Sequence, residues 1–323
     1  MNDQFTRQNF LTAAFLKSSA SLILLAGFFL SLNFTVRAAA FPEQTFVSVR
    51  GTDAGDCSDV NHPCRTVQYA IDQTFSSSIV TIIESGVYDP FTIKTSVTVE
   101  AVAGVSATVL TLAGPGVLID IDPNSTTFGE VTLRGLSFKS RGGTIGVQAV
   151  SCRQLMVENC TFYAFPLQSL LYEAGAATNT VPNNIFVTDS RFLSGTSGLE
   201  IGTTNNALFR KAVVENCHFK GVGMTIKGNT KANVNNSLAS GSVGFRAFGN
   251  AGFVTEMNLE KCVATAGSNG VATFGTGALI RLSNSTVTNN IQTGVQGNVI
   301  SRGNNTVEGN TVNGNFAGTY LAK

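Results

Sequence analysis

The 323-residue chain is poor in several residue types on which functional sites often depend. It contains no tryptophan, so any aromatic platform for a sugar has to come from tyrosine or phenylalanine, and it contains only two histidines. Charged residues make up 13% of the chain, compared with about 25% in an average globular protein. The net charge is +1 and no basic run occurs, so the chain lacks the electrostatic basis for nucleic-acid binding.

A six-residue phrase is repeated along the chain. Its clearest copies are Val157-Glu158-Asn159-Cys160-Thr161-Phe162 and Val214-Glu215-Asn216-Cys217-His218-Phe219, and looser copies begin at Leu133, Val187, Val234, Leu259 and Leu282. The copies recur about every 20 to 30 residues, which is the spacing of solenoid repeats. No window in this region has the apolar spacing of an amphipathic helix, so the repeats predict strands.

A second phrase, a glycine followed by apolar, polar and apolar residues, falls between copies of the first. It begins at Gly146, Gly198, Gly223, Gly244, Gly270 and Gly294. Two strand signatures per turn, with glycine or asparagine at the bends, predict a coil of short parallel strands. The sequence therefore predicts a parallel β-helix.

Residues 1–40 have the pattern of a secretory signal peptide. Arg7 and Lys17 supply positive charge, residues 18–36 are largely apolar, and three alanines at 38–40 offer a cleavage site. The alternative is an uncleaved anchor, because the apolar stretch has about the length that spans a bilayer. We favour cleavage, since that stretch is polar at both ends. On this interpretation the protein is secreted, periplasmic or on the cell surface, with no membrane contact after signal removal.

Residues 41–76 are predicted to precede the coil, which then occupies residues 77–323 together with a C-terminal cap. A short entry strand at 46–49 leads into a loop. Residues 66–75 have the one helical pattern after the signal, with Val67, Ala70, Ile71, Thr74 and Phe75 on a single face. We expect this helix to cover the first turn, because exposed strand edges and core invite association.

The loop before this helix has two interpretations. Cys57 and Cys64 lie seven positions apart, and in an exported chain this spacing predicts a disulfide-closed loop. The alternative is a calcium site formed by Asp53, Asp56 and Asp59, but the loop lacks the glutamate at position twelve of an EF-hand. His62 has no second histidine, cysteine or glutamate at ligand spacing and is interpreted as a turn residue. We therefore predict the disulfide and no metal site.

The beginning and the end of the repeat region resemble a known group of proteins. The segments that carry the resemblance are Phe46-Val47-Ser48, Asp56-Cys57, Pro63-Cys64-Arg65-Thr66, Gly86-Val87-Tyr88 and the run from Gly303 to Asn310. Over residues 46–310 the chain is similar to secreted bacterial right-handed parallel β-helix repeat proteins of the pectate-lyase-like superfamily. The resemblance implies an all-β fold, a single-stranded right-handed parallel β-helix of about ten turns with an N-terminal capping helix.

The catalytic patterns of enzymes with this fold are missing. Polygalacturonases resemble one another in Asn-Thr-Asp, Asp-Asp, Gly-His-Gly and Arg-Ile-Lys motifs, none of which occurs here. We therefore predict no catalytic residue and no cofactor, and expect a rigid scaffold that binds a carbohydrate or a surface protein along one face. The alternative is a polysaccharide lyase acting on uronate-containing polysaccharide, the one case in which Ca²⁺ is expected.

One outward column offers a candidate ligand face. In the glycine-led strands the residue between the two apolar positions points outward, which places Gln148, Glu200, Thr225, Arg246, Ala272 and Gln296 in one column. Glu200, Lys227 and Arg246 would then gather an acid and two bases within about 10 Å. The functional interpretation is a small anionic-sugar or lyase site. The alternative, which we favour, is an ordinary solvated face of mixed charge.

The six-residue phrase presents a second outward column, formed by Arg134, Glu158, Thr188, Glu215, Asn235, Glu260 and Ser283. Glu158 and Glu215 would lie about 10 Å apart, near the upper limit for an inverting glycosidase pair. Alternation with neutral residues also keeps like charges off adjacent strands, and this structural explanation suffices. His218 is expected between Arg191 and Leu238 with no role as a base.

Two further columns of stacked residues are expected at the bends between strands. Asn159, Asp189, Asn216, Asn236 and Asn284 share one bend position, where side chains are expected to form a hydrogen-bonded ladder on left-handed backbone. The next position runs Leu136, Cys160, Ser190, Cys217, Ser237, Cys262 and Ser285, and we predict that it faces inward. Cysteines two rungs apart are separated by about 9.6 Å, beyond the reach of a disulfide, so these three should be free thiols. Cys152 falls in the connection before Leu155 and has no obvious partner, so we expect it to be free as well.

The first testable prediction concerns export. The mature chain should begin within a few residues of Phe41, because the small-residue site ends at Ala40. N-terminal sequencing of the exported protein measures this directly. An N-terminus still at Met1 in a membrane fraction would support the uncleaved anchor instead.

Overall fold

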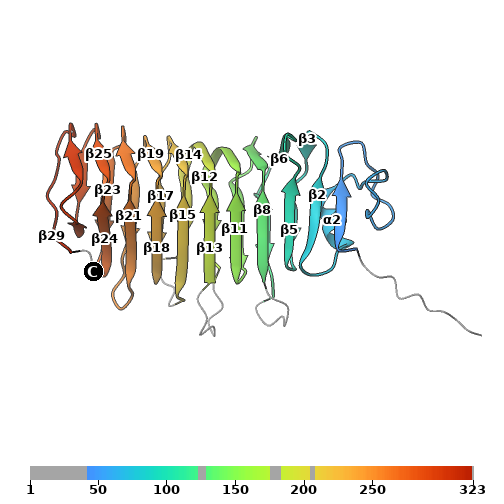
Figure 1. Cartoon of the computed structure of the whole chain (residues 1–323), viewed down its shortest axis with the longest axis horizontal. Helices are drawn as coiled ribbons and strands as arrows, with labels where there is room; N and C mark the ends of the chain where they lie inside the picture. The colour runs from blue at the N-terminus through green and yellow to red at the C-terminus, as the bar shows by residue number, and fades with distance from the viewer. Residues whose placement is uncertain (1–41, 123–128, 175–182, 204–207, 322–323) are drawn as a thin grey trace, which may run out of the picture. The chain divides into compact units, whose positions relative to one another are not determined.

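The computed structural model describes residues 42–122, 129–174, 183–203 and 208–321, so the predicted signal peptide lies outside the described residues. Short parallel strands dominate this part of the chain, and its only helix is α2 (Val67–Asp72). The strands coil into a right-handed parallel β-helix in which successive turns lie side by side (Figure 1). The predicted fold class is confirmed.

No helix within the described ranges is long and apolar enough to cross a membrane.

The first face of the coil is a sheet of twelve strands among the described residues, and every pairing in it is parallel. Each turn of the chain contributes one strand, so paired residues of neighbouring strands lie between 18 (Ile300 and Gly318) and 35 (Gln44 and Ile79) positions apart in sequence. In spatial order the strands are β1 (Gln44–Val47), β2 (Ser78–Ile82), β5 (Val97–Ala101), β8 (Glu130–Arg134), β11 (Gln154–Glu158), β13 (Asn183–Thr188), β15 (Arg210–Glu215), β18 (Thr230–Asn235), β21 (Thr255–Glu260), β24 (Ala278–Ser283), β27 (Val299–Ser301) and β29 (Gly318–Thr319).

The second face follows the first after a sharp bend. Its strands are β3 (Gly86–Tyr88), β6 (Ala107–Thr111), β9 (Leu136–Ser140), the first half of β12 (Thr161–Tyr172), the first half of β14 (Arg191–Ile201), β16 (His218–Lys220), β19 (Leu238–Ser240), β22 (Val263–Thr265), β25 (Thr286–Thr288) and β28 (Thr306–Glu308).

The third face consists of β4 (Phe91–Ile93), β7 (Pro115–Asp120), β10 (Ile145–Ser151), the second halves of β12 and β14, β17 (Met224–Lys227), β20 (Phe245–Phe248), β23 (Asn269–Phe274) and β26 (Thr293–Gln296). The prediction of two strands per turn was therefore wrong, because most turns have three. The six-residue phrase contains a bend after its second residue, so Val157-Glu158 belongs to the first face and Thr161-Phe162 to the second.

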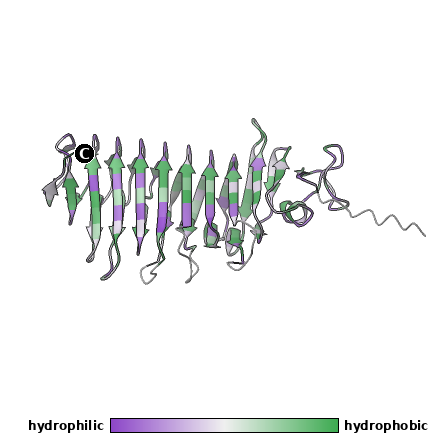
Figure 2. Cartoon of the chain, turned by 60° about the horizontal axis from the view of Figure 1, so that its bottom comes forward, coloured by the Kyte–Doolittle hydropathy of each residue, from purple (hydrophilic) through white to green (hydrophobic). Residues whose placement is uncertain are grey.

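The interior is filled by residues that repeat at equivalent positions of successive turns. Hydrophilic and hydrophobic bands alternate along the strands (Figure 2), as expected when one face of a pleated strand is buried. Phe138, Phe162, Phe192 and Phe219 stack with ring centroids 4.8 to 4.9 Å apart. These rings are fully buried, so the sixth position of the phrase supplies the aromatic part of the core.

Glycine stands at or just before the start of most third-face strands, because the backbones of neighbouring turns approach each other closely at this point. A Cβ on Gly223 would lie 1.6 Å from the carbonyl oxygen of Val243, and one on Gly198 would lie 2.8 Å from the Phe219 ring. Only a residue without a side chain fits at such a contact.

The cysteine and serine column lies inside the coil as predicted. The backbone N–H of Cys160 donates to Ser190 Oγ at 3.1 Å, and that hydroxyl donates to the carbonyl of Thr188 at 2.8 Å. The same arrangement recurs at Cys217 with Ser237 and at Cys262 with Ser285. All three cysteines, together with Cys152, are buried free thiols. The thiols occupy the same place on the alternate rungs, and Cys160 Sγ donates weakly to the carbonyl oxygens of Leu133 and Glu158 at 3.5 and 3.4 Å.

The bend before this column has left-handed backbone, also as predicted. Asn159, Asp189, Asn216, Asn236 and Asn284 all have φ between 47° and 54°. Asn236 Nδ2 donates to Asn216 Oδ1 at 2.6 Å, and Asn216 Nδ2 donates to Asp189 Oδ1 at 3.2 Å. Short amide and carboxyl side chains tolerate this conformation and bond to the next rung, which explains their repetition.

The N-terminal end of the coil is covered by α2 and the disulfide loop. Cys57 and Cys64 form the predicted disulfide, with Cα atoms 5.4 Å apart. The helix is shorter than the predicted 66–75: Thr66 is its N-cap, accepting from the N–H of Tyr69, and the helix ends at Asp72. Val67, Ala70 and Ile71 are buried as expected. Phe75 lies beyond the helix and is 49% exposed, so its placement on the buried face was wrong.

The second testable prediction concerns the thiols. Burial raises the pKa of Cys152, Cys160 and Cys217 to about 12 and that of Cys262 to about 11, so at pH 8 little thiolate forms and alkylation of the native protein should be slow. After denaturation without reductant, mass spectrometry should find four alkylated sites. A count of two or zero would show additional disulfides and a different register for the inward column.

Candidate functional site

The outward column of the glycine-led strands exists in the structure and is longer than predicted. The pairing register aligns Thr92, Leu118, Gln148, Leu171, Glu200, Thr225, Arg246, Ala272 and Gln296. Leu171 was missed because Ser169 stands where the neighbouring turns have Gly146 and Gly198, so β12 lacks the glycine that marks the phrase. The column runs along the third face of the coil.

Glu200 and Lys227 form an ion pair in the middle of this face. Lys227 Nζ lies 2.5 Å from Glu200 Oε1, and the two side chains are 25% and 14% exposed. Glu200 comes from the end of β14 and Lys227 from the end of β17, the next strand along the third face. The pair is therefore far less exposed than the solvated face that the sequence suggested.

Thr225 lies between Glu200 and Arg246 in the column and is almost completely buried, with 1% of its surface exposed. Its hydroxyl Oγ1 makes no hydrogen bond to any residue that the structure describes. Met224 and Ile226 on either side face the core, so Thr225 points to the outer side of the strand, although almost none of its surface is exposed. A buried hydroxyl without a partner is a costly feature unless something else uses it.

Arg246 is the third predicted member of the candidate site, and it is not paired with a carboxylate. No ion pair within 4.0 Å involves Arg246 among the described residues, and its buried Nε has no hydrogen-bond partner there. Burial lowers the pKa of Arg246, while the charge of Glu200 acts in the opposite direction. The guanidinium carbon lies 5.7 Å from the centre of the Phe248 ring, within the range of a cation–π contact.

Phe248 and Phe274 complete the site and were missed by the sequence reasoning. They lie in a second column, which runs beside the column that contains Arg246. In this second column the strand register aligns Lys227 with Phe248 and Phe248 with Phe274. Their rings stack with centroids 4.9 Å apart, and both are partly exposed. The alternation Arg246-x-Phe248 could have revealed the first of them, since residues two apart on a strand share a face.

We use the name central strip for Glu200, Thr225, Lys227, Arg246, Phe248 and Phe274. It carries two cations and one carboxylate. The strip therefore has an excess of positive charge beside an aromatic surface. In the described part of the chain no group of three histidine, cysteine or acidic side chains is placed to hold a metal ion.

The outer surface of the first face has a different electrostatic arrangement. The predicted column from Arg134 to Ser283 is in register, and Arg134 pairs with both Glu100 and Glu158, at 2.9 and 2.6 Å. Glu158, one half of the glycosidase-like pair, is thus held by an arginine. Glu256 similarly pairs with Lys231 and Arg281. Three carboxylates of this face, Glu100, Glu158 and Glu256, are thus balanced by neighbouring cations.

The remaining candidates have structural explanations. Asp53, Asp56 and Asp59 accept hydrogen bonds from their own loop, for example Asp53 from the N–H groups of Arg65 and Thr66. His62 contacts Asp59 at 2.7 Å within the same turn. His218 lies between Arg191 and Leu238 as predicted, and its pKa is lowered by burial and by the nearby Arg191 and Lys220.

Arg210, at the start of β15, is a fully buried charged residue that the sequence did not single out. Its nitrogens donate to the carbonyl oxygens of Glu173, Ala174 and Leu208 at 2.8 to 3.1 Å. Every side-chain nitrogen is therefore engaged with backbone, and the residue ties the chain after β12 to the start of β15. This role is structural.

The fold and the strip together define a right-handed parallel β-helix protein with a cationic and aromatic strip on its third face. A scan against protein-family models, a search of curated proteins and a search of solved structures each found no match to the chain.

The third testable prediction compares two ion pairs. Lys227→Met should lower the free energy of unfolding by about 1–3 kcal/mol, because it leaves the partly buried Glu200 carboxylate without its partner. Lys231→Met is the matched control: Lys231 is 51% exposed and lies 3.5 Å from Glu256, so its loss should cost less than about 1 kcal/mol. Urea unfolding measures both values. Equal and small changes would show that the Glu200–Lys227 pair behaves as an exposed one.

Proposed function

We propose that this protein is an exported, non-enzymatic β-helix scaffold of the pectate-lyase-like kind that binds an acidic carbohydrate along its third face. The observation that carries the proposal is Arg246, a partly buried guanidinium without a carboxylate partner among the described residues, set beside the stacked rings of Phe248 and Phe274.

The chemistry of the central strip suits an anionic sugar. A guanidinium group binds carboxylate or sulfate through two parallel hydrogen bonds, and it does so more strongly where water is partly excluded. Phe248 and Phe274 present a partly exposed apolar surface against which the C–H face of a sugar ring packs. Lys227 contributes a second cation.

The geometry of the third face suits a linear polymer. The aligned column from Thr92 to Gln296 extends over about 40 Å, given a rise of about 4.8 Å per rung. All its strands except the two at the ends pair on both sides, so binding costs little conformational entropy in the protein. A rigid and elongated surface of this kind favours a saccharide chain over a compact ligand.

Two features support export. The first 40 residues have the composition of a signal peptide, and the disulfide between Cys57 and Cys64 is of the kind that persists in oxidising compartments. The proposed location is therefore secreted, periplasmic or at the cell surface.

The alternative function is a polysaccharide lyase acting on uronate polymers. One observation favours it: burial lowers the pKa of Arg246, which is the direction needed for a base that removes the proton next to a uronate carboxylate. In this alternative Arg246 would be the base, and Lys227 would face the substrate carboxylate.

The fourth testable prediction concerns binding by the mature protein. On a glycan array, wild type should bind chains that carry carboxylate or sulfate groups and should not bind their neutral counterparts. Arg246→Ala should raise the Kd by about tenfold or more, the loss expected for one charge-assisted contact. Phe248→Ala should weaken binding without changing the preference for anionic chains. Lys139→Met is the control, since Lys139 is exposed on the second face.

Two outcomes would contradict this proposal. Failure of wild type to bind any glycan, or equal affinity of wild type and Arg246→Ala, would remove the central strip as a carbohydrate site. Formation of unsaturated uronides from polygalacturonate, followed by ultraviolet absorbance and lost in Arg246→Ala, would instead establish the lyase alternative.

A further inference from the structure

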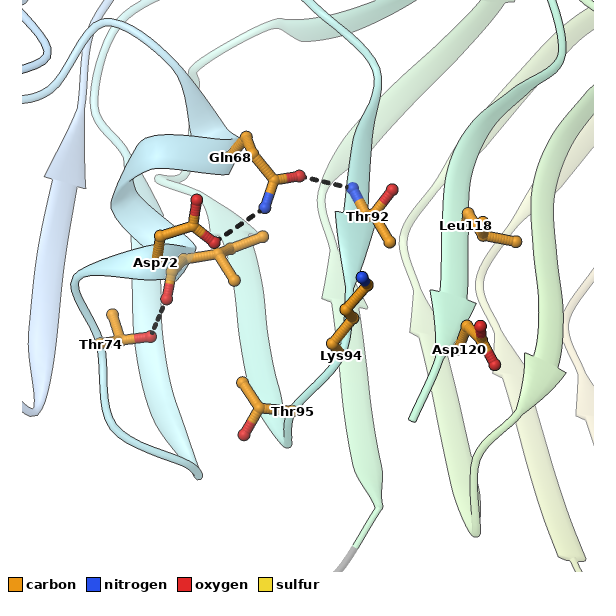
Figure 3. A pocket seen from close by; sticks show the side chains of 9 residues that line it. Gln68, Asp72, Thr74, Thr92, Lys94, Thr95, Leu118 and Asp120 are labelled. Carbon is orange, nitrogen blue, oxygen red and sulfur yellow. Dashed lines mark hydrogen bonds between the residues drawn. The ribbon is translucent and has the colours of Figure 1, made fainter. Parts of the chain in front are cut away.

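A separate cleft lies at the N-terminal end of the third face, between α2 and strands β4 and β7. Its volume is about 740 Å³, within the range of about 300–1,000 Å³ that is usual for small-molecule sites. In Figure 3, Gln68 and Asp72 line the cleft from the helix, Thr92 lines it from β4, Lys94 from the residue after β4, and Leu118 and Asp120 from β7. The cleft therefore has one helical wall and a floor that belongs to the third face.

The helix closes this end of the face. Gln68 Oε1 accepts a hydrogen bond of 2.7 Å from the backbone N–H of Thr92, and Gln68 Nε2 donates to Asp72 Oδ1 at 3.0 Å (Figure 3). The first bond fixes α2 against the third-face strand β4. A chain lying along the third face therefore meets the helix and cannot continue past it.

The cleft contains polar groups that the protein itself does not use. Lys94 and Asp120 are exposed, and neither makes a hydrogen bond or ion pair within the described parts of the chain. Leu118, which is partly exposed and lies two residues before Asp120 on β7, adds an apolar surface on the floor. A sugar ring has hydroxyl groups at its edge and C–H groups on its faces. A site for such a ring therefore needs a hydrogen-bond acceptor, a donor and an apolar patch around one cavity, and this cleft has all three.

The floor of the cleft is continuous with the central strip. Thr92 and Leu118 are the first two members of the same column that later contains Glu200, Thr225 and Arg246. A saccharide that reaches the central strip and extends toward the N-terminal end of the coil therefore enters the cleft and ends at α2.

We propose that the cleft between α2 and β7 binds the terminal sugar unit of a saccharide chain, so that the third face holds chains by one end. This inference rests on the proposed function. Asp120 accepts hydrogen bonds from hydroxyl groups of the terminal ring, Lys94 donates to a ring hydroxyl or carboxylate, and Leu118 packs against the face of the ring.

The experiment uses the mature protein and one set of acidic oligosaccharides attached to a surface in two orientations, through the reducing end or through the non-reducing end. Attachment blocks whichever end it uses. A site that needs a free end should therefore bind one orientation at least about tenfold more tightly than the other. The double variant Lys94→Met with Asp120→Asn should lose this preference and bind about tenfold more weakly to the favoured orientation.

The matched control is Lys139→Met with Glu308→Gln, which makes the same chemical changes at two exposed positions on the second face. All variants should unfold at the temperature of wild type, because the altered side chains are exposed. The control should retain both the affinity and the orientation preference of wild type.

The outcomes separate the two proposals. Equal binding to both orientations, or a preference that the cleft variant retains, would overturn end-binding while leaving the function of the central strip intact. Absence of binding to any glycan would overturn the proposed function, and the terminal-sugar site with it.

Discussion

The parallel hydrogen-bonded ladder between successive turns is the constraint on which the rest of the structure depends. It places equivalent residues about 4.8 Å apart along the coil, so each position of the repeat becomes a column of stacked side chains. Phenylalanine rings stack at 4.8 to 4.9 Å because this spacing suits parallel rings. Asparagine at the bend bonds to the asparagine of the next turn for the same reason.

Stacking also limits how charge is placed on the outside, since identical charges on adjacent turns repel. The first face meets this limit by placing Arg134 between two glutamates and by pairing Glu256 with two cations. The third face does so only in part. Glu200 is paired with Lys227, but Arg246 is left with an aromatic ring as its neighbour. Among the described residues, Arg246 is therefore a partly buried cation without a carboxylate partner, set beside an aromatic surface.

The capping helix connects stability with the proposed function. A β-helix needs its terminal turn covered, and α2 does this by burying Val67, Ala70 and Ile71. The same helix bonds to Thr92 through Gln68, and this contact forms the wall of the cleft on the third face. One element thus ends the solenoid and also sets where a ligand lying along it has to stop.

The sequence by itself determined the properties that follow from counting residues along a periodic chain. Period-two alternation and repeats of 20 to 30 residues indicated the β-helix, the inward cysteines, the asparagine bends and the outward columns. The distance between Cys57 and Cys64 along the loop indicated their disulfide. These features depend on register, which the ladder transmits from one turn to the next without change.

Only the tertiary structure decided how side chains from different turns and columns meet. The first face could not be separated from the second by sequence, because the bend after Glu158 or Glu215 falls inside the six-residue phrase. Burial of Thr225, the missing carboxylate partner of Arg246 and its contact with Phe248 depend on the reach of long side chains across adjacent columns. The cleft depends on where a six-residue helix ends and packs. Such contacts are set by three-dimensional packing, which the period of the repeat does not specify.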